Sequence, residues 1–226
     1  MNYEIYSEES NVIGFYDYTV MRNKIGANKE NYMSREGRMR CLYFNQDINY
    51  LVDLSSQEAF NKDTYSIRIY DEDWEHMILD KQSNRGGTIY RQHTYLSPVQ
   101  CESILHGDIE WMKDSECLLF RDLYLQMTIN QRWPGVIVDY SRQMFRLGYG
   151  GDYLIFDTAI ESTYDIKLGQ LSAPSLACSS FNMERRLEPG KVVMTYHQEM
   201  GMPKVLANIM DMSLSYRLSG SQTGTK

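Results

Sequence analysis

The sequence predicts an α+β fold built on an antiparallel sheet or barrel. Apolar and polar residues alternate with a period of two in many short stretches, as in Thr64–Tyr70, which is typical of strands with two different faces. Predicted strands outnumber predicted helices and mostly follow one another in hairpin order. The chain also contains 18 tyrosines, whose amphipathic rings suit half-buried strands.

The predicted strands share this alternation and are bounded by turn-forming residues. They span Arg40–Phe44, Thr64–Tyr70, Met77–Asn84, Ile89–Tyr95, Gly135–Phe145, Asp152–Ile160 and Lys191–Gln198. The run Arg85-Gly-Gly-Thr88 lies between two of them and predicts a tight hairpin turn.

Helices are predicted from capping residues and from apolar spacing. Ser97-Pro98-Val99-Gln100 predicts a capping box and a helix that ends at His106, before Gly107. Asp114 or Ser115 is expected to cap a longer helix that stops before Pro134. Two further helices are expected, a weak one within Val12–Ile25 and another from Pro203 to about Met212.

Length and composition bound the class of protein. A chain of 226 residues corresponds to one domain, expected over residues 1–217, with a flexible tail over 218–226. The net charge of −7 argues against nucleic-acid binding. The four cysteines form no CxxC pair, the polar N-terminus is unlike a signal peptide, and no apolar run is long enough to insert into a membrane. A cytoplasmic protein is therefore expected.

Several strands carry polar residues on the face opposite an apolar one. Val193, Thr195 and His197 alternate with Val192, Met194 and Tyr196 in one strand. In Ile78–Asn84 the polar set is Asp80, Gln82 and Asn84. A barrel with a wet interior produces this pattern, and so does a sheet with one solvated face. Alternation alone does not decide between them.

Six segments in order resemble the bacterial VTC domain, a family of polyphosphate polymerases within the triphosphate-tunnel (CYTH-like) superfamily. They are Arg40-Cys-Leu-Tyr-Phe44, Ser66-Ile-Arg-Ile-Tyr70, Leu79-Asp80 with Arg91, Pro134-Gly-Val-Ile-Val-Asp-Tyr140-Ser-Arg142, Phe156-Asp157-Thr-Ala-Ile160, and Glu188-Pro189-Gly190 with Pro203. Their order and spacing agree with the family from about Tyr3 to Gln222. The resemblance implies an antiparallel β-tunnel of about eight strands with helices packed outside.

In that family, inward-facing Arg and Lys bind the phosphate chain and carboxylates hold Mn²⁺ or Mg²⁺ on it. The resemblance therefore implies site residues here. The phosphate or anion-binding candidates are Arg40, Lys62, Arg68, Arg91, Arg142 and Tyr140, and the metal candidates are Glu4, Asp80 and Asp157. They leave a formal charge of +2 in the tunnel. Phosphate, polyphosphate or a nucleoside triphosphate is the implied ligand, and a kinase-like or membrane protein encoded nearby is the implied partner.

The departures from the family pattern fall on the expected tunnel face. Tyr6 and Tyr153 stand where the family has a lysine and an arginine, and His197 stands at another lysine position. Neutral residues also replace charged ones at Thr64, Ser66, Gln82, Asn84, Thr195 and Gln222, and Ile155 replaces a threonine. Because much of a bound polyphosphate would be left unpaired, we expect a degenerate tunnel without polymerase activity, in a binding, scaffold or regulatory role.

Two alternatives remain open. In the first, the protein is a metal-dependent enzyme of the superfamily, with Arg40, Arg68, Arg91 and Arg142 clamping an anion and Glu4, Asp80 and Asp157 holding Mn²⁺ or Mg²⁺. In the second, these arginines make surface or cross-strand ion pairs and bind nothing small. His197 is expected to be structural.

Overall fold

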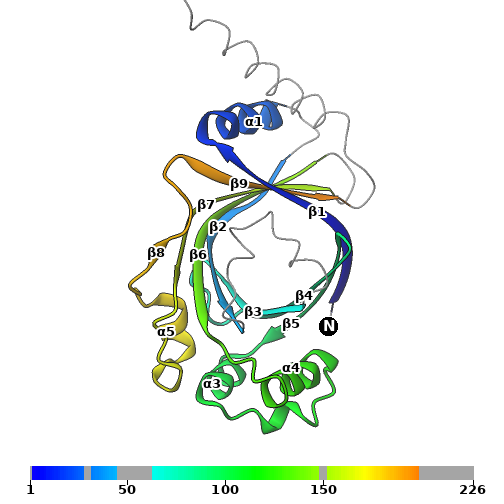
Figure 1. Ribbon diagram of the computed structural model, residues 1–226, viewed down its shortest axis with the longest axis vertical. Coiled ribbons are helices and arrows are strands. Elements are labelled where there is room, and N and C mark those ends of the chain that lie inside the picture. Colours follow the sequence, from blue (N-terminus) through cyan, green and yellow to red (C-terminus); the bar gives the residue numbers. More distant parts are fainter. Residues whose placement is uncertain (1, 28–31, 45–62, 148–151, 199–226) are drawn as a thin grey trace, which may run out of the picture.

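The computed structural model describes residues 2–27, 32–44, 63–147 and 152–198. Within these ranges the chain forms a closed antiparallel β-barrel with helices on its outside (Figure 1). The α+β prediction and the antiparallel barrel are therefore confirmed. The predicted helix from Pro203 and the expected tail over 218–226 lie outside the described residues.

Nine strands form one sheet, and eight of them close the ring. They are β1 (Asn2–Gly14), β2 (Tyr32–Tyr43), β3 (Asp63–Tyr70), β4 (Met77–Arg85), β5 (Thr88–Leu96), β6 (Val136–Arg146), β7 (Tyr153–Thr163), β8 (Glu184–Arg185) and β9 (Lys191–Gln198). The order is β6-β2-β3-β4-β5-β1-β9-β7, and β7 pairs back with β6 to close the ring. The short β8 pairs only with β7, outside the ring.

Strand β1 is the main element that the residue pattern did not predict. Its first half pairs with β5 and its second half with β9, so this long strand bridges two parts of the ring. The weak helix expected within Val12–Ile25 begins later, as α1 (Phe15–Ala27). Residues Val12–Gly14 belong to the strand instead.

The other described helices are α3 (Pro98–His106), α4 (Leu118–Thr128) and α5 (Ala173–Cys178), with 3₁₀ turns at Glu110–Met112 and Leu168–Gln170. The Ser97 capping box and the left-handed Gly107 end are confirmed for α3. The expected cap of α4 is wrong, because its N-cap is Cys117, whose side chain makes no capping hydrogen bond. Ser115 instead accepts a hydrogen bond from the Cys117 amide.

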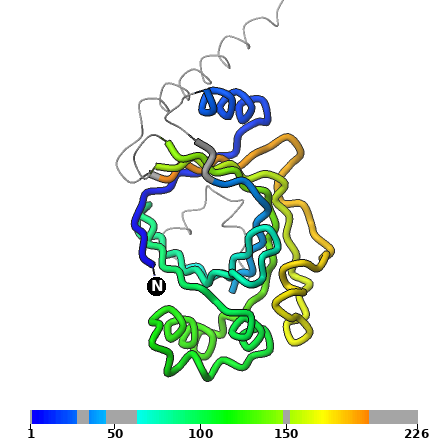
Figure 2. The backbone as a smooth tube through the Cα atoms, turned by 180° about the vertical axis from the view of Figure 1, so that it is seen from behind, coloured from blue at the N-terminus to red at the C-terminus, as the bar shows by residue number. Residues whose placement is uncertain are grey.

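Helices cover the outside of the barrel on separate sides. Figures 1 and 2 show α1 against one side of the ring and α3 and α4 against the opposite side. The outward residues of β3, such as Tyr65, Ile67 and Ile69, pack with α3 and α4 in the largest core cluster. A second cluster joins α1 to the outward residues Met194 and Tyr196 of β9. Alternate residues of each strand therefore face inward.

A β-bulge lies where β6 and β7 close the ring. The register shifts between Asp139 and Ser141, and Ala159 of β7 lies in the left-handed region with φ 51°. An extra residue in one strand increases its bend and twist, which helps a sheet to close. Ile160, which follows the bulge, lines the interior.

None of the helices that the structure describes is both long and apolar enough to cross a lipid bilayer.

Candidate functional site

The barrel interior contains a cavity of about 270 Å³. Inward residues of several strands line it, among them Thr64, Ser66 and Arg68 of β3, Asp80, Gln82 and Asn84 of β4, and Val193, Thr195 and His197 of β9. These are the polar faces that alternation singled out. The structure therefore favours the wet-interior interpretation over a sheet with one solvated face.

Three arginines line this cavity, and a carboxylate that also lines it contacts each of them. The Nε of Arg91 donates to Oδ1 of Asp80 at 2.7 Å, and Nη2 of Arg68 donates to the same oxygen at 3.1 Å. Arg142 donates to both oxygens of Asp157, each at 2.7 Å. Bidentate pairs of this kind are the strongest class of charge-assisted hydrogen bond.

The electrostatics of these pairs follow from burial. Burial raises the pKa of Asp80 to about 6, although Arg68 acts in the opposite direction. Burial also opposes the charge of Arg68 and of Arg142, but their aspartate partners outweigh it and raise both guanidinium pKa values above the usual range. Arg68 and Arg142 therefore remain charged at neutral pH.

Tyr140, another predicted anion contact, lines the same cavity and is buried. Its hydroxyl lies 3.5 Å from the Cys41 sulfur, and the Arg142 guanidinium lies 5.0 Å from the centre of its ring. Burial raises the Tyr140 pKa well above its usual value, so the phenol remains neutral.

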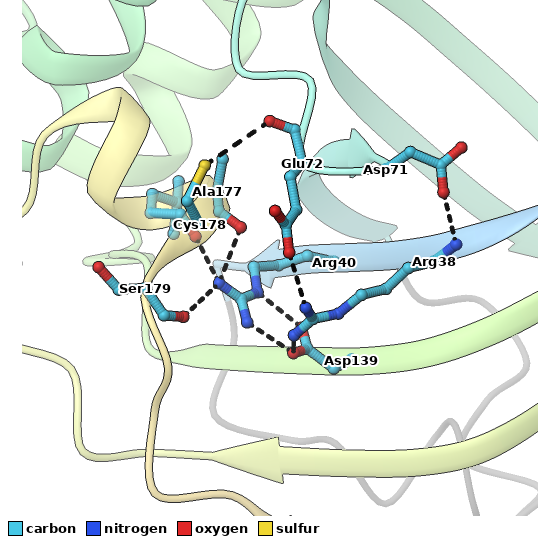
Figure 3. A network of polar contacts seen from close by, with 9 residues as sticks. Arg38, Arg40, Asp71, Glu72, Asp139, Ala177, Cys178 and Ser179 are labelled. Atoms are coloured by element: carbon cyan, nitrogen blue, oxygen red, sulfur yellow. Dashed lines mark hydrogen bonds and ion pairs between the residues drawn. The ribbon is translucent and has the colours of Figure 1, made fainter.

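Arg40 does not face the cavity, and its prediction as a tunnel residue is wrong. It lies on the outer face of β2 and bonds bidentately to Asp139 of β6 at 2.7 and 2.6 Å (Figure 3). Its Nη1 donates to the carbonyls of Leu176, Ala177 and Ser179 at the end of α5, all within 3.0 Å. Arg40 therefore fastens α5 to the barrel wall, which explains its burial without a ligand.

The remaining predicted residues are dispersed. Glu4 faces inward beside the cavity, where its carboxylate lies 3.9 Å from Nη1 of Arg91 and is 45% exposed. Lys62 lies outside the described residues. Among the residues that the structure describes, no three His, Cys, Asp or Glu side chains come together as a group that could hold a metal ion. Glu4, Asp80 and Asp157 thus form no common set of oxygen ligands.

Glu8 is the site residue that sequence analysis missed. It lines the cavity from β1, directly opposite His197 of β9, and it makes no hydrogen bond or ion pair to another described residue. Burial raises its pKa to about 7, against the effect of Arg142. The alternation of Tyr6, Glu8 and Ser10 would have placed it on the same face as Glu4.

His197 also faces the cavity and lies beside two tyrosines, Tyr6 and Tyr153. The centre of its ring is 3.6 Å from that of Tyr6 and 5.7 Å from that of Tyr153. Burial lowers the His197 pKa, so its imidazole is neutral at physiological pH. These three residues therefore form a cluster of aromatic rings at the cavity.

The charge in the cavity differs from the expected +2. The residues that line it supply three guanidinium groups, Arg68, Arg91 and Arg142, and three carboxylates, Glu8, Asp80 and Asp157. The formal charges of these described residues cancel. Compared with the expected set, Arg40 faces outward, Lys62 lies outside the described residues, Glu4 lies beside the cavity and Glu8 adds a carboxylate. The three arginines that line the cavity do make cross-strand ion pairs, as the second alternative from the sequence analysis expected.

No protein-family model matches the chain, and no curated protein matches it. The solved structures that are similar to it include the PH1819 protein from Pyrococcus horikoshii OT3, with 9% identity, a TM-score of 0.43, and coverage of 94% of this chain and 88% of that chain. Another is a "putative adenylate cyclase" from Vibrio parahaemolyticus, with 8% identity, a TM-score of 0.39, and coverage of 94% and 87%. At these TM-scores neither likeness carries an argument, and the barrel is established by its own strand pairings.

Proposed function

We propose that this protein is a degenerate VTC-like tunnel domain that lacks polyphosphate polymerase activity and acts by binding, as a scaffold or regulator. Phosphate anions bind in its tunnel at most weakly. The observation that carries this proposal is that each arginine lining the cavity already contacts an aspartate lining the same cavity. A protein partner belongs to the same proposal.

A phosphate chain has to compete with these internal carboxylates. To bind the Nε/Nη2 edge of Arg142, a phosphate oxygen must displace Asp157, which already accepts hydrogen bonds from both of these nitrogens at 2.7 Å. The displaced carboxylate would then lie buried beside the incoming anion, and uncompensated buried charge costs several kcal/mol. The described residues that line the cavity have a formal charge of zero, so they provide no excess of positive charge to offset that cost.

A catalytic metal does not fit the described residues. Mn²⁺ and Mg²⁺ require several oxygen ligands, and catalytic sites usually supply them from grouped carboxylates. Here Asp80 is bonded to Arg68 and Arg91, Asp157 is bonded to Arg142, and Glu4 lies on the other side of Arg91. The described residues thus offer no donor set for a metal-dependent phosphoryl transfer.

The direct test is an activity assay. We expect no polyphosphate to accumulate when the purified protein is incubated with ATP and either Mn²⁺ or Mg²⁺, measured by a polyphosphate stain after electrophoresis. An active VTC-type polymerase assayed in parallel is the positive control. Accumulation at an enzymatic rate that is lost in Arg142→Ala would overturn the proposal and favour the metal-dependent enzyme.

Removing an internal carboxylate should convert the tunnel into an anion site. Asp157→Asn leaves Arg142 without its bidentate partner, so we expect the free energy of unfolding to fall by about 3 kcal/mol. Tripolyphosphate should then recover part of the lost melting temperature, because it pairs with the freed guanidinium. The wild-type melting temperature should change by less than about 1 °C under the same conditions.

Asp122→Asn is the matched control for this rescue. Asp122 bonds to Lys81 and Tyr65 on the outer side of the barrel, so its loss frees no arginine in the cavity. Tripolyphosphate should leave its melting temperature unchanged. A wild-type protein stabilised by several degrees at submillimolar tripolyphosphate would show that the internal aspartates do not block the anion.

A further inference from the structure

The cavity contains polar groups whose bonding capacity no described residue uses. Nε of Arg68 and Nε2 of His197 are buried and have no hydrogen-bond partner in the described part of the chain. The Glu8 carboxylate likewise has none. The large majority of buried side-chain polar atoms in proteins are bonded, so the buried, unbonded nitrogens of Arg68 and His197, together with the half-buried Glu8 carboxylate, indicate a ligand.

Two of these groups are acceptors and lie next to each other. Glu8 and His197 are directly opposite on β1 and β9, and both line the cavity. The neutral imidazole, with its proton on Nδ1, accepts a hydrogen bond at Nε2. A carboxylate and an imidazole acceptor side by side form a pair that an ammonium group can satisfy, since it carries three N–H donors.

The third group, Nε of Arg68, is a hydrogen-bond donor and lies in a cationic region of the cavity. Arg68 is 8% exposed and shares a single oxygen of Asp80 with Arg91. Two guanidinium groups therefore have one buried carboxylate between them, and the more exposed Glu4 only approaches Arg91 at 3.9 Å. The open Nε of Arg68 in this cationic region is suited to a carboxylate oxygen.

We propose that the barrel cavity binds a small zwitterion, whose ammonium group pairs with Glu8 and His197 and whose carboxylate pairs with Arg68. The proposal rests on the proposed non-catalytic binding function and names the class of ligand. It accounts for all three open groups and adds no net charge to a cavity whose own charges cancel.

The walls of the cavity fit such a molecule. Tyr6, whose ring contacts that of His197, lies close enough to both Glu8 and Arg68 for their charges to affect it. Burial raises the Tyr6 pKa far above its usual value, so the ring between the two ends is neutral. The volume of about 270 Å³ is below the usual range for drug-sized ligands and suits a molecule of amino-acid size.

The test is calorimetric titration of the full-length protein at pH 8 with glycine, β-alanine, 4-aminobutyrate, 5-aminovalerate and 6-aminohexanoate. This series varies the distance between the ammonium and carboxylate groups. We expect saturable binding of one or two adjacent members. Butylamine and butyrate, which each carry only one of the two charges, should bind at least about tenfold more weakly.

Two variants test the assigned contacts. Glu8→Gln removes the charge that pairs with the ammonium, and Arg68→Lys keeps a cation while it removes Nε. Each should weaken the best zwitterion at least about tenfold. Glu9→Gln is the control, because Glu9 is exposed on the opposite face of β1. Circular dichroism establishes that each variant is folded.

Three results would overturn the zwitterion proposal. The first is that no member of the series shows saturable binding up to about 10 mM, which is tenfold above the upper end of typical substrate levels. The second is that butylamine or butyrate binds as tightly as the best zwitterion, and the third is that Glu8→Gln binds that zwitterion as tightly as wild type. These outcomes are separable from failure of the proposed function, which is measured by polyphosphate accumulation. A protein that makes no polyphosphate and binds no zwitterion would retain the first proposal and lose the second.

Discussion

Replacing Arg40 with alanine is expected to lower the free energy of unfolding by about 3–5 kcal/mol, because it removes one partner of a buried ion pair. Arg40 is 3% exposed, and its guanidinium donates hydrogen bonds to both oxygens of Asp139 and to three carbonyls near the end of α5. Without it, these carbonyls lose their shared donor and α5 loses its attachment to β2. Urea denaturation monitored by circular dichroism measures the change.

Arg38→Ala is the matched control for Arg40→Ala. Arg38 lies two residues away on the same face of β2 and bonds to the same Asp139 oxygen at 2.6 Å, but its side chain is 46% exposed (Figure 3). Exposed ion pairs contribute about 1 kcal/mol or less. Equal losses for the two variants would contradict the conclusion that burial and the α5 carbonyls make Arg40 the structural member of the pair.

The pKa of Asp139 reports the same network. Burial opposes the carboxylate charge, but hydrogen bonds from Arg40 and Arg38 outweigh burial and lower its pKa. A lowered folded pKa means that this stabilisation is present above the ordinary aspartate pKa and is lost as the pH falls through the folded value. The stability that Arg40→Ala loses relative to wild type should therefore be largest at neutral pH.

Period-two alternation was sufficient to predict most of the barrel. Each predicted strand from β2 to β9 coincides with a strand of the structure, and the capped helix α3 was predicted to its last residue. Alternation did not identify β1, because its polar residues fall on both faces: Glu4 and Glu8 face inward, while Ser7 and Glu9 are exposed. Alternation identifies a strand only when its two faces differ in polarity.

The candidate site was predicted less completely. Arg68, Arg91, Arg142, Asp80 and Asp157 do converge on one cavity, where the resemblance implied they would lie. Arg40 was wrongly predicted to face the tunnel. Its partners include carbonyls of α5 that are distant in the sequence, so no local pattern around Arg40 indicates that it faces outward. Pairing within the cavity depends on which strands adjoin, and no local pattern encodes that.

Replacing Glu8 with glutamine is expected to stabilise the unliganded protein at pH 8 by up to roughly 3 kcal/mol. Burial raises the Glu8 pKa from 4.5 to about 7, and a pKa difference of one corresponds to about 1.4 kcal/mol. A raised folded pKa means that the stabilisation is fully present below pH 4.5 and is lost as the pH rises through 7. The neutral amide avoids this loss.

Wild type and Glu8→Gln have the same charged groups around position 8, so comparing their stabilities isolates the effect of the Glu8 carboxylate. The charged groups that affect Glu8 are Arg142, Asp157 and Asp80, and the neutral His197 imidazole lies opposite it on β9. Urea denaturation at pH 5, 6, 7 and 8 should show the difference in unfolding free energy growing with pH. Glu9→Gln, at an exposed position, should match wild type throughout. A constant difference between Glu8→Gln and wild type would contradict the burial of an unpaired carboxylate.

The same variant gives an opposite result in the presence of a ligand. An ammonium group beside Glu8 would provide the partner that the described residues do not, so a bound zwitterion should stabilise wild type at pH 8 and leave Glu8→Gln unchanged. The stability advantage of Glu8→Gln should therefore shrink as the ligand is added. Retaining a carboxylate that destabilises the empty barrel is consistent with a binding role for Glu8, because sites that bind ligands are often less stable without them.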